Sequence, residues 1–185
     1  MKFNDRSALR GEHAFLSASK YHWTNYSPEK LVNTFTNWQA AQRGTEMHDL
    51  AAKLIEMKVK LPANENAFNM FVNDAIGFRM SPEQPLFYSI NAFGTADAIS
   101  FRNNTLRIHD LKTGVTKVSM RQLEVYTALF CLEYDEQPNE MDIELRVYQG
   151  DTIIVHTPET QDIFDIMHTI VEFDRIIEKL KTEME

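Results

Sequence analysis

The sequence predicts an α/β (mixed α+β) fold in which helices flank one central, mixed sheet. Hydrophobic residues recur at helical spacing before residue 80 and then switch to the alternation that is typical of strands. The 185 residues, 43% of them hydrophobic, suit a single globular domain covering residues 1–185. No repeat or Gly/Ser-rich linker marks a boundary within it.

Three helices are expected in the first half of the chain. The first begins at Ser27-Pro28-Glu29, where Ser can cap the helix and Pro suits its first position. We expect it to end near Gly44, and we expect further helices over residues 45–58 and 64–79. The proline-rich segment 81–85 is then expected to break the chain.

The second half is expected to form strands, with two further helices. Short strands are predicted over residues 86–92, 95–102 and 106–112, with turns at Phe93-Gly94 and Asn103-Asn104. A helix over 118–133, a hairpin of strands 141–148 and 152–156, and a final amphipathic helix over 158–181 complete the order.

The formal charge of −8 argues against a protein that coats nucleic acid through bulk positive charge. It leaves open an acidic site that acts on nucleic acid through divalent cations, because a bound metal ion reverses the local sign.

Cys131 is the only cysteine, which excludes an intrachain disulfide and a four-thiolate cluster within one chain. An iron–sulfur cluster is therefore not expected. A reducing, cytoplasmic setting fits this composition, and no apolar run approaches the roughly 20 residues that cross a bilayer, so no membrane association is expected.

The segment 105–114 carries the most chemical information. Asp110 and Lys112 share one face of a predicted strand and interrupt its apolar pattern, and Asp97 does the same on the preceding strand. Buried charges need a partner, a cleft or a metal ion. Two converging carboxylates, with a carbonyl such as that of Leu111, suit Mg²⁺ or Mn²⁺, and Lys112 adds a positive charge beside them.

Four motifs in order resemble the RecB-like branch of the PD-(D/E)xK nucleases, which includes phage exonucleases and CRISPR-associated exonucleases. They are Gly44-Thr45-Glu46-Met47-His48, Gly94-Thr95-Ala96-Asp97, Asp110-Leu111-Lys112 and Gln122-Leu123-Glu124-Val125-Tyr126. His13 to Ser19, followed by Trp23, also resembles the start of phage-encoded members. The resemblance covers roughly residues 13–130 and implies a restriction-endonuclease-like fold.

The resemblance implies a role for each motif residue. His48, Asp97 and Asp110 would bind the metal, Lys112 would position or activate water, and Gln122 with Tyr126 would support the site and contact DNA. It implies a Mg²⁺- or Mn²⁺-dependent deoxyribonuclease, an exonuclease rather than an endonuclease, used in recombination or genome processing by a phage or mobile element. A homo-oligomer or a recombination partner protein would fit such a role.

Other interpretations of the same residues stay open. Asp110 and Lys112 can form an ordinary surface ion pair, Asp97 can cap a turn after Gly94, and His48 can be a surface or core histidine. The chain as a whole can be a nuclease-fold protein that binds DNA or regulates without cutting. It can also be a structural interaction protein built around its last helix, which would have no metal site.

Overall fold

The structure is a computed structural model that describes residues 14–115 and 117–184. The chain divides after Thr45 into two compact units, which are described here one by one. The expectation of a single nuclease domain stays a prediction, and all of the predicted site residues belong to the second unit.

The first unit is built around aromatic side chains. It contains the 3₁₀ segment Ala18–Asn25 and the beginning of helix α1. The ring of Phe15 lies 5.1 Å from that of Phe35 and 5.6 Å from that of Trp38, between centroids. His13, which the resemblance includes, lies outside the described residues.

Helix α1 (Pro28–Glu56) is continuous, so the predicted end near Gly44 and the new start at Thr45 are wrong. The Thr45 hydroxyl donates to the carbonyl of Ala41, 3.3 Å away, as a residue inside a helix does. One internal glycine costs about 1 kcal/mol relative to alanine, and the good helix formers around Gly44 outweigh that cost.

The second unit contains a five-stranded mixed sheet in the order β1-β2-β3-β4-β5. Its strands are β1 (Ser81–Ser89), β2 (Ala92–Arg102), β3 (Thr105–Lys112), β4 (Asp142–Gln149) and β5 (Thr152–His156). Neighbours are antiparallel except β3 and β4, which run parallel and are connected through helix α3 (Arg121–Tyr134). The prediction of a mixed sheet flanked by helices is confirmed.

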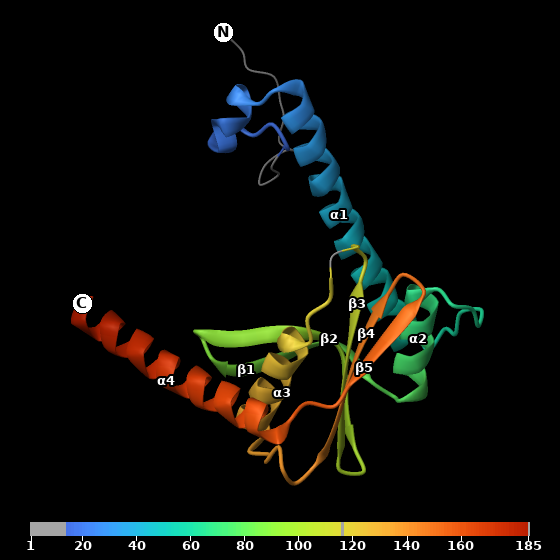
Figure 1. The fold of residues 1–185 in the computed structure, drawn as a ribbon, viewed down its shortest axis with the longest axis vertical. Coiled ribbons are helices and arrows are strands. Elements are labelled where there is room, and N and C mark those ends of the chain that lie inside the picture. The colour runs from blue at the N-terminus through green and yellow to red at the C-terminus, as the bar shows by residue number, and fades with distance from the viewer. Residues whose placement is uncertain (1–13, 116, 185) are drawn as a thin grey trace, which may run out of the picture. The chain divides into compact units, whose positions relative to one another are not determined.

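Helices cover both sides of this sheet (Figure 1). Helix α2 (Ala67–Gly77) and the last part of α1 share one apolar core with Leu111 and Tyr148 of the sheet. Helix α3 and the buried start of α4 (Thr160–Met184) form the other core, with Leu106, Ile108 and Leu145. Strands β3 and β4 are therefore buried from both sides, as parallel strands usually are.

Two details of the predicted strands are wrong. Residues 81–85 belong to β1, where Pro82 is tolerated because β1 is an edge strand of the sheet. The turn between β1 and β2 falls after Ser89 instead of at Phe93-Gly94, because Phe93 and Gly94 pair with Phe87 and Leu86.

The other predicted turns are confirmed. Asn103 and Asn104 adopt positive φ angles of 51° and 59° between β2 and β3, as a two-residue hairpin turn requires. Gly150 has a φ of 64° in the hairpin of β4 and β5.

Among the described residues, no helix combines the length and the apolar character that a membrane crossing would need.

A polar cluster is buried beneath α2. The Tyr148 hydroxyl donates to Asp74, at 2.7 Å, and lies 3.1 Å from Nδ1 of the fully buried His109. Burial, followed by the charges of Arg146 and Arg107, lowers the pKa of His109 to about 3. The imidazole is therefore neutral in the folded protein at neutral pH.

This burial predicts a pH dependence of stability. An unfolded histidine titrates near a pKa of about 6.5, so between pH 6.5 and 3 the unfolded chain binds a proton that folded His109 does not. From pH 7 to 5 this group should lower the free energy of unfolding by up to about 2 kcal/mol. In urea unfolding, His109→Gln should lose this component and the exposed control His168→Gln should keep it. Equal pH dependence in both variants would contradict the assignment.

Candidate metal centre and active site

The site residues lie where β2 and β3 separate. The last backbone pair between these strands is Ala98 with His109. Beyond that pair, β2 continues along β1 and β3 continues along β4 as far as Lys112. Asp97 and Asp110 are the first residues past the separation, one on each strand, so their carboxylates share the opening between the two strands.

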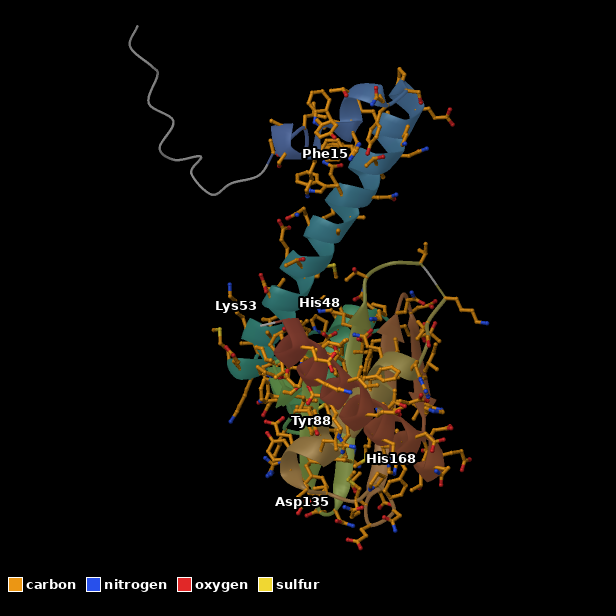
Figure 2. All side chains as sticks on the ribbon, turned by 90° about the vertical axis from the view of Figure 1, so that its left-hand side faces the viewer. Phe15, His48, Lys53, Tyr88, Asp135 and His168 are labelled. Atoms are coloured by element: carbon orange, nitrogen blue, oxygen red, sulfur yellow. The ribbon has the colours of Figure 1, made fainter. Side chains whose placement is uncertain are left out.

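Both carboxylate oxygens of Asp97 contact a polar group of the protein. Its Oδ2 accepts the backbone N–H of Leu111 at 2.8 Å, which replaces a hydrogen bond of the strand ladder. Its Oδ1 lies 3.3 Å from Nδ1 of His48. His48 belongs to the part of α1 that lies in the second unit (Figure 2). The hydrogen bond to Asp97 raises the pKa of His48 despite the partial burial of the ring.

A chain of hydrogen bonds runs from Asp110 to helix α3. Lys112 Nζ lies 3.1 and 3.0 Å from the two carboxylate oxygens of Asp110 and donates to Oε1 of Gln122 at 2.8 Å. The amide nitrogen of Gln122 in turn donates to the hydroxyl of Tyr126 at 3.0 Å. The two side chains therefore lie on one face of α3, as residues four apart in a helix do.

The nearby Lys112 does not fully offset the effects that raise the pKa of the buried Asp110 carboxyl. Burial, followed by the charge of Asp97, raises its pKa, and Lys112 and His48 act in the opposite direction. Its Oδ2 is fully buried and has no hydrogen-bond partner other than the ion-pair contact with Lys112. A further cation at this place would relieve the repulsion between the two carboxylates.

Glu83 of β1 joins the site, and the sequence analysis missed it. Single ligand atoms of His48, Glu83 and Asp97 all lie within 4.8 Å of one another. The pairs Pro82–Ala98 and Gln84–Ala96 place Glu83 beside Asp97 across the two strands. Burial, followed by the charge of Asp97, raises the pKa of Glu83. Had residues 81–85 been recognised as a strand, the same register would have indicated it.

The donor set fits a divalent cation with oxygen and imidazole ligands, such as Mg²⁺ or Mn²⁺. His48, Glu83 and Asp97 offer a nitrogen and two carboxylates, and Asp110 offers a buried oxygen nearby. Leu111 contacts the site through its backbone N–H, which donates to Asp97. A role for the Leu111 carbonyl as a metal ligand therefore stays a prediction.

Gly94 allows α3 to approach β2 closely. A Cβ atom added at Gly94 would lie 2.9 Å from Cε1 of Tyr126, closer than real Cβ contacts come. Burial raises the pKa of Tyr126, so its hydroxyl stays protonated at neutral pH. The glycine of the Gly94-Thr95-Ala96-Asp97 motif therefore makes room for the ring that ends the hydrogen-bond chain.

Comparison with known proteins leaves the family open: no model of a known protein family matches the chain, and a search of curated proteins finds no significant match.

Replacing Gly94 with alanine should displace the Tyr126 ring and break its bond to Gln122. We expect a loss of about 1–3 kcal/mol in the free energy of unfolding, because a methyl group is forced into a packed interface. The matched control is Gly77→Ala, where an added Cβ meets no atom within 4 Å. Denaturant unfolding of both variants tests this, and equal stabilities would contradict the packing argument.

Glu83 should contribute to metal affinity. We expect Glu83→Gln to weaken Mn²⁺ binding about tenfold, because removal of one charged ligand or close neighbour typically costs that much. Glu65→Gln, at an exposed carboxylate in the loop before α2, is the matched control. Isothermal titration calorimetry measures both, and unchanged Mn²⁺ affinity in Glu83→Gln would remove Glu83 from the ligand set.

Proposed function

We propose that the chain is a metal-dependent nuclease of the PD-(D/E)xK type, in its RecB-like branch, that hydrolyses phosphodiester bonds of DNA. One observation carries the proposal: Lys112 Nζ contacts Asp110 and Gln122 at the point where β2 and β3 separate, beside the His48–Asp97 pair. An ordinary surface ion pair would not account for a second carboxylate, a histidine and a polar helix residue converging beside the buried Asp110.

Lys112 is held so that it can still act on a substrate. An ammonium group has three N–H donors, and the contacts with Asp110 and Gln122 use two of them. The remaining donor can hold the attacking water or a phosphate oxygen. The positive charge also offsets the negative charge that develops on the pentacovalent phosphorus.

Asp97 and Asp110 would hold the divalent metal together with His48 and Glu83. The metal would lower the pKa of the attacking water and stabilise charge on the phosphate oxygens. The protein fixes both carboxylates before substrate arrives, Asp97 through the Leu111 N–H and Asp110 through Lys112. Hydrolysis forms a bond from phosphorus to the water oxygen and breaks the bond from phosphorus to the leaving deoxyribose oxygen. The water gives up one proton to solvent, and the leaving oxygen takes one up.

The hydrogen-bond chain that begins at Asp110 ends on α3, at Gln122 and Tyr126. The Gln122 amide orients Lys112 through its oxygen and Tyr126 through its nitrogen, which leaves the phenolic proton of Tyr126 free to donate to a phosphate oxygen. These two residues would therefore orient the DNA strand at the site.

Exonuclease activity, DNA as substrate and a role in phage or mobile-element recombination follow from the resemblance of the four motifs. A homo-oligomer or a recombination partner protein would fit the same role. The site residues themselves support hydrolysis of a phosphodiester and do not distinguish a chain end from an internal bond.

The proposal is tested with end-labelled linear duplex DNA and closed circular DNA in Mn²⁺, with EDTA as the metal-free control. Asp110→Asn and Lys112→Ala should each slow cleavage about 100-fold or more, because each removes charge stabilisation or positioning at the reacting phosphate. Asp142→Asn is the matched control, since Asp142 is an exposed aspartate at the other end of the sheet, paired with Thr105.

Loss of the linear substrate alone would identify an exonuclease, and nicking of the circle an endonuclease. Wild-type activity in a folded Asp110→Asn variant would overturn the proposal. DNA binding without cleavage by the wild-type protein would instead support a nuclease-fold binding protein.

A further inference from the structure

A polar pocket lies in the second unit at the C-terminal end of β2, five residues beyond Asp97. Its volume is about 680 Å³, and its lining includes Phe78, Arg79, Phe101, Arg102, Asn103 and Arg107. None of the described residues that line it carries a carboxylate. Three arginines thus gather around one pocket of a chain whose formal charge is −8.

The three arginines differ in how they are held. Arg107 donates to Glu144 at 3.2 Å and stacks its guanidinium over the ring of Phe78, 4.7 Å from the centroid. Arg79 and Arg102 are exposed, and neither forms an ion pair with any residue in the described part of the chain. The pocket therefore offers two unneutralised guanidinium groups beside a third that is fixed in place.

Nearby carboxylates do not cancel this charge. Glu144 is shared between Arg107 and Arg146, and Asp74 is bound by Arg146 and Tyr148. These two acids are thus matched by Arg107 and Arg146. Asp142, which pairs with Thr105 across the strands, forms no ion pair with an arginine of the described residues, so the charges of Arg79 and Arg102 remain. Positive potential at one place on an acidic protein attracts an anion locally.

The chemistry of the lining favours a phosphate with an attached base. The planar fork of a guanidinium matches the oxygens of a phosphate group. Phe101 is 37% exposed and packs one side against Phe130, with ring centroids 5.3 Å apart, so part of its surface stays open for an aromatic base. An acidic peptide would use the arginines but would have no need of the ring.

We propose that this pocket binds the phosphate of a nucleotide unit, at a site separate from the metal centre. Asp97 and Arg102 are five residues apart on β2, which is about 17 Å along an extended strand. The ligand is either a free mononucleotide or one unit of a nucleic-acid strand. Binding at this pocket does not require cleavage at the metal centre.

The test measures binding of a 5′-fluorescein-labelled oligodeoxynucleotide to the full chain by fluorescence anisotropy, in EDTA so that nothing is cleaved. The double variant Arg79→Gln/Arg102→Gln should weaken binding about tenfold and flatten the dependence of log affinity on log salt by about 1.4, corresponding to two lost phosphate contacts. The matched control is Arg175→Gln/Lys179→Gln, which removes two exposed positive charges from α4.

Competition with deoxyadenosine monophosphate separates the two sources of the phosphate. Displacement of the labelled strand would identify a mononucleotide site, and binding that resists the competitor would identify a strand site. Equal weakening in the two double variants, or no weakening in Arg79→Gln/Arg102→Gln, would overturn the proposal. Binding of a polyglutamate peptide through the arginines, without the oligonucleotide, would overturn it as well.

Discussion

The arrangement of the site depends on the hydrogen bond between the carboxylate of Asp97 and the backbone N–H of Leu111. Strand β2 leaves β3 after the Ala98–His109 pair, and this separation removes ladder partners from the last residues of β3. A buried backbone N–H without a partner would be costly, and the Asp97 carboxylate supplies that partner. The same bond fixes the orientation of Asp97. The separation of the two strands therefore also determines where the Asp97 carboxylate lies in the site.

Repulsion between acidic groups follows from this geometry. Glu83, Asp97 and Asp110 lie on three consecutive strands. Burial, followed by the charge of Asp97, raises the pKa of both Glu83 and Asp110. His48 and Lys112 offset part of the repulsion, one on each side of the opening. The folded chain thus holds, on three strands, acidic groups that a divalent cation would stabilise.

The sequence singled out residues that lie close together in the structure, even where it misplaced the elements that carry them. Asp97, Asp110 and Lys112 stood out because charged residues interrupted apolar strands, a signal that persists when strand boundaries are wrong by several residues. Gln122 and Tyr126 were implied by the resemblance of the fourth motif, and their spacing of four residues places them on one helix face. The continuity of α1 through Gly44 and the strand at Pro82 were missed, because packing and edge position override local preferences there. Glu83 was missed as a consequence, since its role depends on strand register with Asp97 and not on any local pattern.

The central claim is that the opening between β2 and β3 holds a divalent metal ion beside Lys112. The most direct measurement is anomalous diffraction from crystals of the protein grown with Mn²⁺. We expect an anomalous peak within coordination distance, about 2.0–2.3 Å, of carboxylate oxygens of Asp97 and Asp110, with His48 turned from its pair with Asp97 towards the ion. Crystals in which Mn²⁺ binds elsewhere, with the His48–Asp97 and Asp110–Lys112 pairs unchanged, would contradict it.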